Sequence, residues 1–128
     1  MKNNGYRVAV AGATGAVGQV MLEILQERKF PVRDIRLLAS ERSVGKSLRF
    51  NGQEVRVEKL AKDSFSGIEI ALFSAGAQRS KEFCPAAAEA GAVCIDNSSA
   101  FRMEKDIPLV VPEINPDDIG MYKNLSLI

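Results

Sequence analysis

One segment with three evenly spaced glycines constrains the fold of this chain more than any other feature. The segment reads GATGAVG, and its glycines are Gly12, Gly15 and Gly18. An apolar run at residues 7–11 precedes it, and residues 19–27, with apolar side chains at near-helical spacing, follow it. Ile35–Ala39 is predicted to be a second strand, so the order is strand, tight glycine turn, helix and strand. This order is typical of one βαβ unit.

A two-residue turn predicts an antiparallel element after this unit. Asn51-Gly52 separates Ser47–Phe50 from Glu54–Lys59, and Asn-Gly between alternating segments is a strong hairpin signal. The expected fold class is therefore α/β: a Rossmann-like, doubly wound, mostly parallel sheet with an antiparallel hairpin as an ornament. Because the chain has 128 residues and no internal repeat, we expect a single domain over residues 1–128.

The second half of the chain continues the alternation of strands and helices. Buried strands are predicted at Ile68–Ser74 and Val93–Ile95, with a helix at Ser80–Ala90 between them. Pro85 lies inside that helix and predicts a kink or a late start, because proline has no amide hydrogen. A shorter strand is predicted at Leu109–Val111.

Two further patterns lie near the end of the chain. Asn115, Pro116 and the two aspartates after them predict a helix start, since they combine an N-cap, a first-turn proline and acids that suit the helix dipole. Leu125–Ile128 is typical of the beginning of a strand, and natural chains rarely stop inside such an apolar run. We therefore expect this chain to be a fragment of a longer protein.

The overall composition excludes several classes of protein. Hydrophobic residues make up 46% of the chain and charged residues 26%, which predicts a folded domain and not a disordered tail. Seventeen Lys and Arg oppose 16 Asp and Glu, so no strong field attracts nucleic acid. No segment resembles a signal peptide or approaches the roughly 20 apolar residues of a membrane helix. We expect a soluble, cytoplasmic protein that binds neither nucleic acid nor membrane.

Cysteine and histidine usage excludes several kinds of site. The chain has no histidine, and hence no Ser-His-Asp triad, no Cys-His pair and no ordinary zinc site; no bound metal is expected. Cys84 and Cys94 lie in apolar stretches and lack the CxxC spacing of metal and redox motifs. They are predicted to be buried, inert thiols.

Within a βαβ unit, the glycine triplet favours dinucleotide binding. The first glycines permit a tight turn and a close approach of the backbone to a pyrophosphate. The last permits close packing of the helix on the strand, so that the helix N-terminus faces the phosphates. A purely structural turn is the alternative, because a glycine triplet by itself is weak evidence.

The end of the second strand indicates the choice of cofactor. Arg42 offers a fork for the 2′-phosphate of NADP and a flat face for adenine, and Ser40 and Ser43 offer hydroxyls. Glu41 argues against this interpretation, since a carboxylate that pointed inward would repel a 2′-phosphate. Arg42 could also be a solvated loop charge. On balance the segment favours NADP over NAD.

A polar loop, DNSSAFR at residues 96–102, follows the strand at Val93–Ile95. Open α/β sheets bind ligands at the carboxyl ends of their strands, so Arg102 could hold a phosphate or a carboxylate there. A loop of Asx-turns with a surface arginine is an equally good interpretation of the spacing alone.

Five segments occur in order along the chain: GATGAVG, LLASERSVGKSL, ALFSAG, DNSSAFRM and VVPEINPDD. Together they resemble the N-terminal half of the bacterial aspartate-β-semialdehyde dehydrogenase family, over essentially the whole chain and at the family's spacing. The resemblance implies NADPH-dependent reduction of L-aspartyl-4-phosphate to the semialdehyde with release of phosphate, on the route to lysine, threonine and methionine. It also implies a two-domain enzyme with an acyl phosphate and phosphate as ligands. We expect the full-length protein to be a homodimer or homotetramer.

The resemblance assigns roles to individual positions. It implies cofactor contacts at Thr14, Gly15, Ala16, Val17, Arg42, Ser43, Ser74, Ala75 and Gly76, and the glycine motif and the end of the second strand add Gly12 and Ser40. It further implies that Arg102 holds the substrate's phosphate and that Asn97 lies beside the substrate. The family's nucleophilic cysteine and its histidine lie beyond the strand that begins at Leu125. No residue of this chain is therefore predicted to be catalytic, and the fragment alone is expected to be inactive.

Two other functions remain open at this point. N-acetylglutamyl-phosphate reductases share the architecture, although DNSSAFRM and the RSVGK loop favour the aspartate branch. A redox-sensing module that binds NADP without chemistry is the non-enzymatic alternative. Sequence beyond Ile128 would discriminate between them, because a following Asn-x-x-Cys segment supports the reductase.

Overall fold

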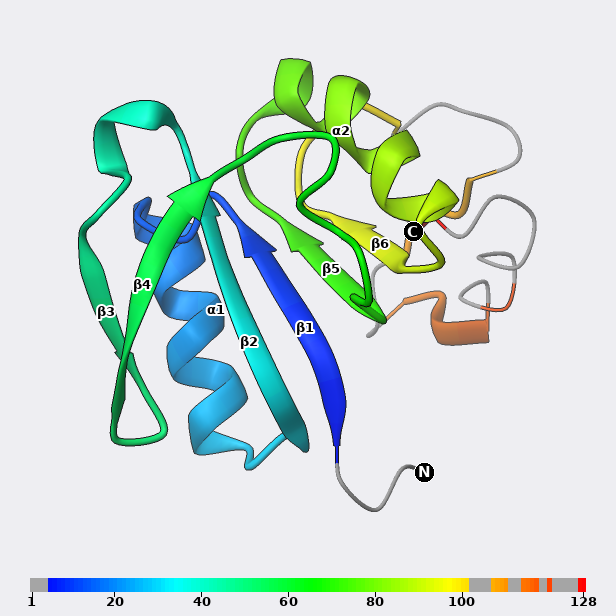
Figure 1. Cartoon of the computed structure of the whole chain (residues 1–128). Helices are drawn as coiled ribbons and strands as arrows, with labels where there is room; N and C mark the ends of the chain where they lie inside the picture. Colours follow the sequence, from blue (N-terminus) through cyan, green and yellow to red (C-terminus); the bar gives the residue numbers. More distant parts are fainter. Residues whose placement is uncertain (1–4, 102–106, 111–113, 118–119, 121–126) are drawn as a thin grey trace.

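A mostly parallel sheet carries the helices of this protein, as the computed structural model shows for residues 5–101, 107–110, 114–117, 120 and 127–128. Among these residues, six strands pair in the order β3-β4-β2-β1-β5-β6 (Figure 1). The strands are β1 (Tyr6–Ala11), β2 (Val32–Ala39), β3 (Ser47–Phe50), β4 (Gln53–Lys59), β5 (Ile70–Phe73) and β6 (Val93–Asp96). Helix α1 (Ala16–Glu27) joins β1 to β2, α2 (Ala77–Glu89) joins β5 to β6, and a 3₁₀ turn, η1 (Glu41–Ser43), follows β2.

The pairing of the strands confirms the predicted Rossmann-like class. β1 is central and pairs in parallel with β2 on one side and with β5 on the other. β4 extends the sheet beyond β2, and β6 extends it beyond β5, again in parallel. Only β3 with β4 is antiparallel among the described strands. The strand order changes direction beside β1, which is where doubly wound sheets form their ligand crevice.

The alternation of side chains along β1 builds a core on each face of the sheet. Val8 and Val10 pack with Leu22 of α1 on one face. Ala9 and Ala11 pack on the other face with residues of α2, among them Cys84. Successive strand residues point to opposite faces, so a strand that is covered on both sides must be apolar throughout. This explains why residues 8–11 are all apolar and buried.

The predicted hairpin is confirmed, but it is more than an ornament. Asn51 and Gly52 both have positive φ, 50° and 80°, the conformation of the two-residue turn that matches strand twist. β4 also pairs in parallel with β2, with Leu37 opposite Val57. The hairpin therefore continues the parallel sheet and forms its edge.

Both helices begin about one turn earlier than the sequence predicts. α1 begins at Ala16 and α2 at Ala77, and the residues before them, Gly15 and Gly76, provide no side-chain hydrogen bond to the helix. A helix start is normally predicted from a Ser, Thr, Asp or Asn cap. Glycine caps leave no such signal, so both starts were placed too late.

Pro85 does not delay the start of α2. It lies inside the helix, where its missing amide hydrogen leaves the carbonyl of Lys81 without an intrahelical partner. Both residues lie on the exposed face, so water can hydrogen-bond that carbonyl. This location makes the proline tolerable, and the prediction of a late start is wrong.

The predictions near the end of the chain have mixed outcomes. Leu109 and Val110 form no strand, and the Leu109 carbonyl accepts a hydrogen bond from Asn115 Nδ2 at 2.7 Å, so it takes part in a local contact and not in a ladder. Pro116 begins a 3₁₀ turn. Leu127 bridges Cys94 in parallel, as the predicted strand requires. Val111, Asp118 and residues 125–126 lie outside the described residues.

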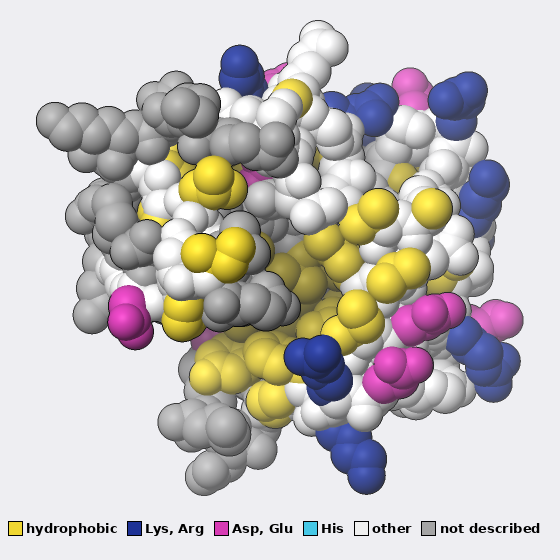
Figure 2. All heavy atoms as spheres, turned by 180° about the vertical axis from the view of Figure 1, so that it is seen from behind, with side chains coloured by type: hydrophobic (Ala, Val, Ile, Leu, Met, Phe, Trp, Pro, Cys, Tyr) yellow, Lys and Arg dark blue, Asp and Glu magenta, His cyan; other side chains and the backbone are white. Residues whose placement is uncertain are grey.

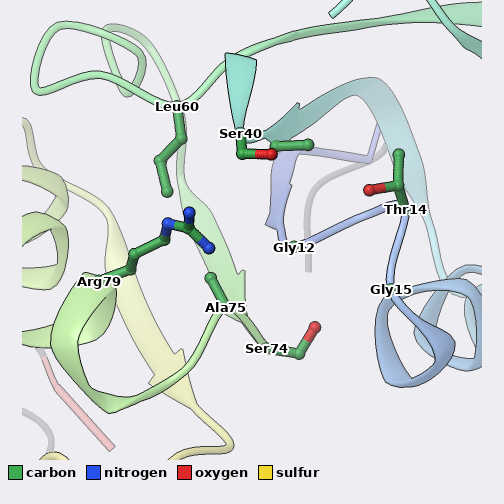
Figure 3. A pocket seen from close by; sticks show the side chains of 9 residues that line it. Gly12, Thr14, Gly15, Ser40, Leu60, Ser74, Ala75 and Arg79 are labelled. Atoms are coloured by element: carbon green, nitrogen blue, oxygen red, sulfur yellow. The ribbon is translucent and has the colours of Figure 1, made fainter. Parts of the chain in front are cut away.

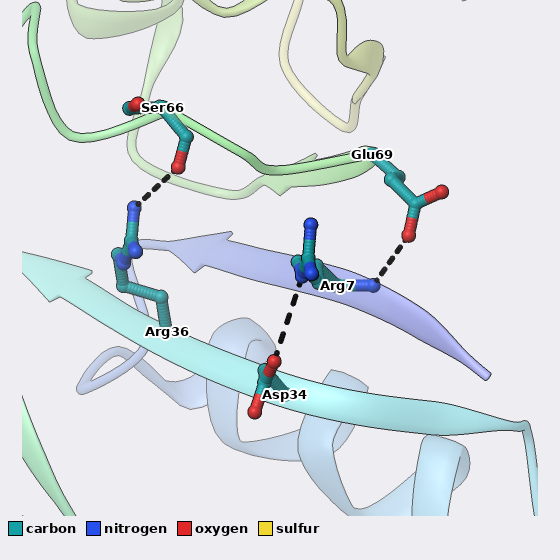
Figure 4. A network of polar contacts seen from close by, with 5 residues as sticks. All are labelled: Arg7, Asp34, Arg36, Ser66 and Glu69. Carbon is teal, nitrogen blue, oxygen red and sulfur yellow. Dashed lines mark hydrogen bonds and ion pairs between the residues drawn. The ribbon is translucent and has the colours of Figure 1, made fainter. Parts of the chain in front are cut away.

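A polar network joins β1, β2 and the segment before β5 away from the carboxyl ends of the strands (Figure 4). The backbone N–H of Arg7 donates to Glu69 Oε1 at 3.0 Å, and the side-chain Nε of Arg7 lies 3.7 Å from Asp34 Oδ2. The guanidinium of Arg36 donates to the carbonyl oxygen of Ser66 at 3.3 Å. The exposed ion pair of Arg7 with Asp34 adds little stability. Together these contacts engage the charged side chains of this region within the protein.

The described part of the surface carries charges of both signs on the face drawn in Figure 2. On the face seen in Figure 2, hydrophobic side chains gather in a central band, and basic and acidic side chains both lie around it. α1 exposes Val17, Val20 and Ile24, each more than 40% accessible. Among the described residues, no helix combines the length and the apolar character needed to cross a bilayer.

Candidate cofactor-binding site

The turn after β1 is built around Gly12. Gly12 has φ +88°, a conformation that side-chain-bearing residues rarely adopt, and its N–H donates to the Leu38 carbonyl at 2.8 Å. A Cβ atom at this position would lie 2.6 Å from the carbonyl oxygen of Ser74. The end of β1 is therefore held directly against the ends of β2 and β5.

Gly18 allows α1 to pack on this turn. A Cβ atom on Gly18 would lie 2.0 Å from the Gly12 carbonyl oxygen, so no side chain fits between the helix and the turn. A Cβ atom on Gly15 would lie 3.4 Å from the same Gly12 oxygen, which is a tight but possible contact. The conformational roles predicted for the first and last glycines are confirmed.

The first turn of α1 points its free backbone donors to the carboxyl edge of the sheet. The N–H groups of Ala16, Val17 and Gly18 precede the first helical donor, which is the Gln19 N–H bonded to the Gly15 carbonyl, so they have no partner within the helix. Ala16 and Val17 are exposed. Free N–H groups at the positive end of a helix form a ready site for a phosphate group.

A pocket of about 190 Å³ lies beside the turn, between the ends of β1, β2 and β5 and the segment after β4 (Figure 3). It is lined by Gly12, Thr14, Gly15, Ala39, Ser40, Leu60, Ser74, Ala75 and Arg79. These residues come from distant parts of the chain and meet where the strand order changes direction. This is the position at which open α/β sheets bind nucleotides.

The hydrogen bonding of the Ser74 hydroxyl indicates whether a cofactor fits this pocket. Its Oγ is buried and has no hydrogen-bond partner among the described residues. Figure 3 shows this oxygen directed into the space between the end of β5 and the glycine turn. Buried hydroxyls are nearly always paired, so one left unpaired at the wall of a pocket suits a ligand oxygen. The pocket therefore fits the ribose or phosphate part of a dinucleotide.

The residues after β2 divide into a buried and an exposed group. Ser43 is buried, and its Oγ lies 3.2 Å from Thr14 Oγ1, so η1 is tied to the glycine turn. Glu41 and Arg42 are exposed. Arg42 has no hydrogen bond or ion pair with any described residue, which leaves its guanidinium available to a ligand.

The pocket brings together about half of the predicted cofactor contacts. Those that line it are Gly12, Thr14, Gly15, Ser40, Ser74 and Ala75. Those that do not line it are Ala16, Val17, Arg42, Ser43 and Gly76. Ala16 and Val17 still lie at the helix N-terminus next to the lining, and Gly76 precedes α2.

Arg79 is a lining residue that sequence reasoning missed. It lies in the first turn of α2, and Figure 3 shows its guanidinium between Leu60 and Ala75. The prediction that the helix begins at Ser80 left Arg79 in an unassigned loop. The spacing from Gly76 could have revealed it, because a residue in the first turn after a strand end faces the carboxyl edge of the sheet.

The loop after β6 is anchored by Asp96. Ser80 Oγ donates to Asp96 Oδ1 at 2.7 Å, the Ser98 N–H donates to the same oxygen at 3.0 Å, and Ser98 Oγ donates to Oδ2 at 2.7 Å. Asn97 is exposed at the carboxyl edge, and its N–H donates to the Phe73 carbonyl at 2.9 Å. The Asx-turn alternative is thus present. Arg102 lies outside the described residues, so its role stays a prediction.

The two cysteines form a buried contact away from the pocket. Cys84 of α2 and Cys94 of β6 are both free and fully buried, with their Sγ atoms 2.7 Å apart. Burial, followed by the neighbouring Cys84 thiol and the Asp96 carboxylate, raises the pKa of Cys94 far above its usual range. A thiol that stays protonated is a poor nucleophile. The prediction that both cysteines are buried is confirmed.

Comparison with known proteins agrees with this geometry. Residues 7–122 match the family described as "Semialdehyde dehydrogenase, NAD binding domain". The aspartate-semialdehyde dehydrogenase of Aquifex aeolicus is 57% identical over 125 residues, which cover 97% of this chain and 37% of that protein. The crystal structure of Vibrio cholerae aspartate semialdehyde dehydrogenase II complexed with ASA has a TM-score of 0.93 at 56% identity, covering 97% of this chain and 40% of that one.

A more distant solved structure is that of aspartate semialdehyde dehydrogenase with NADP from Candida albicans. It has a TM-score of 0.79 at 29% identity and covers 93% of this chain and 37% of that one. The chain spans 36–37% of the length of the curated relatives that it matches first. Through the family match over residues 7–122, this chain belongs to the semialdehyde dehydrogenase NAD-binding domain family.

Proposed function

We propose that this chain is the NADP-binding part of an aspartate-semialdehyde dehydrogenase. The enzyme would reduce L-aspartyl-4-phosphate with NADPH and a proton to give L-aspartate-4-semialdehyde, phosphate and NADP⁺, in the biosynthesis of lysine, threonine and methionine. The observation that carries the proposal is the pocket at the change of strand order. There the glycine turn, the end of β2 and the unpaired hydroxyl of Ser74 face one space.

In this proposal the residues of the chain bind and orient the cofactor, which supplies the hydride. The free N–H groups at Ala16 and Val17 hold the pyrophosphate through the positive end of α1. Ser74 donates its hydroxyl to a ribose or phosphate oxygen. Arg102 and Asn97 would hold the substrate, an assignment that rests on the family resemblance.

The preference for NADP over NAD rests on Arg42. Its guanidinium is exposed and unpaired among the described residues, and the contact between Ser43 and Thr14 holds η1 beside the phosphate turn. A bidentate arginine suits a 2′-phosphate, which carries two charges that a ribose hydroxyl lacks. The nucleophilic cysteine of the family has no counterpart here, so the proposal assigns binding to this chain and catalysis to a longer protein. We propose a cytoplasmic homodimer or homotetramer for that protein.

Calorimetric titration of the 128-residue chain tests the proposal. We expect NADPH to bind weakly and at least about tenfold tighter than NADH, since one bidentate charged contact accounts for such a ratio. The chain should form no NADPH from the semialdehyde, phosphate and NADP⁺, whereas the longer protein should. The proposal would be overturned if the chain bound neither NADPH nor NADH, or if the chain alone catalysed the reaction. Turnover of N-acetylglutamyl phosphate by the longer protein would favour the related reductase.

A further inference from the structure

The pocket has two chemically different halves. The half next to the glycine turn presents backbone and hydroxyl groups from Gly12, Thr14 and Ser74. The half toward α2 is lined by Leu60 and Ala75, whose side chains are apolar (Figure 3). Phosphates and ribose suit the polar half, and a flat apolar ring suits the other.

Arg79 is the one charged side chain that lines the pocket among the described residues. Its guanidinium extends between Leu60 and Ala75 (Figure 3). It forms no hydrogen bond or ion pair with any described residue. The planar cation thus lies in the apolar half of the pocket, and no group in the part of the chain that the structure describes neutralises it.

The backbone that carries Arg79 is fixed. The next residue, Ser80, is fully buried, and its hydroxyl donates to Asp96 while its N–H donates to the Gly76 carbonyl at 3.0 Å. The first turn of α2 is therefore held to the end of β6. When a ligand arrives, only the side chain of Arg79 and not its backbone has to be ordered, which limits the entropic cost of binding.

We infer that Arg79 binds the adenine ring of the cofactor, with its guanidinium over one face of the ring and Leu60 against the ring from the other side of the pocket. Guanidinium groups stack on aromatic faces, and an aliphatic side chain is a good partner for the opposite face. The inference rests on the proposed function, because it assumes that a dinucleotide occupies the pocket.

This placement gives the two arginines different roles. Arg42 lies on η1, which is tied to the phosphate turn through Ser43, whereas Arg79 lies on α2 and points into the apolar half. Arg79 should therefore contribute to the binding of every adenine nucleotide. Arg42 should contribute only where a 2′-phosphate is present.

Titration of the 128-residue chain and its variants with NADP⁺ and NAD⁺ tests this assignment. We expect Arg79→Ala to weaken both nucleotides by a similar factor of about five, the strength of one cation–π contact. Arg79→Lys should recover little of the loss, because an ammonium has no flat face. Arg56→Ala is the matched control: Arg56 is exposed on β4 and does not line the pocket, so affinity should not change.

Each other outcome would contradict the inference in a recognisable way. A loss for NADP⁺ alone, restored by Arg79→Lys, would show that Arg79 contacts a phosphate. Unchanged affinity in Arg79→Ala, with normal binding by the unaltered chain, would remove Arg79 from the site and leave the proposed function standing. Absence of binding by the unaltered chain would overturn both. Thermal unfolding should be the same in all variants, since Arg79 is exposed.

Discussion

The two sides of the pocket are built on different principles. At the glycine turn, backbone atoms decide the geometry, because Gly12 and Gly18 leave no room even for a methyl group. Exposed side chains differ in this respect: Arg79 of α2, which lines the pocket, and Arg42 of η1, which lies outside the lining, have no partner among the described residues. The first side is rigid and suits any dinucleotide. The exposed arginines can change without loss of the fold, so in the proposed function they are the groups that would select among cofactors.

The largest expected effect is that of Gly18→Ala. The added Cβ would lie 2.0 Å from a backbone oxygen, which cannot move without separating α1 from the turn. We expect the free energy of unfolding to fall by about 3 kcal/mol or more, as in severe overpacking, measured by urea denaturation.

The matched control is Gly15→Ala in the same turn, where the corresponding distance is 3.4 Å and φ is −74°. That variant should stay close to the parent in stability, although its affinity for NADPH can change. Equal stability of the two variants would show that the turn is not sterically fixed, and the contrast between the two sides of the pocket would disappear.

The next effect concerns the selecting side. Arg42→Ala should weaken NADP⁺ by about tenfold or more and leave NAD⁺ nearly unchanged, because only NADP⁺ presents a 2′-phosphate to the guanidinium. The stability of the fold should not change, since Arg42 is exposed. Calorimetric titration with each nucleotide measures the ratio. Equal losses for both would mean that Arg42 supports the loop or contacts the adenine.

The smallest expected effect is an increase in the stability of the fold. Ser74→Ala removes a buried hydroxyl without a partner, so the free protein should become more stable by about 1 kcal/mol while its affinity for NADPH falls. Ser43→Ala is the comparison, since Ser43 is also buried but pairs with Thr14, and it should lower stability by a similar amount. A loss of stability in Ser74→Ala would mean that its hydroxyl is paired in the free protein.

The same contrast explains how much could be predicted from the sequence. β1 and the glycine turn could be predicted because burial on both faces and the lack of space for a side chain each restrict the residue types to a few. The starts of α1 and α2 could not, since their glycine caps leave no side-chain signal. Arg79 was missed for that reason, and because the direction of an exposed side chain depends on tertiary packing. The strand at Leu109 was predicted from apolar character alone, without a neighbour to pair with.

The central position of β1 also governs when the pocket can form during folding. β1 pairs with β2 across a single helix, but its pairing with β5 joins segments that the whole hairpin separates. Pairings between distant segments form slowly, because they close long loops. The contact between Gly12 and Ser74 exists only once β5 has paired. A nucleotide that fills the pocket therefore binds only the state in which the sheet is complete. By mass action, such binding shifts the folding equilibrium toward that state.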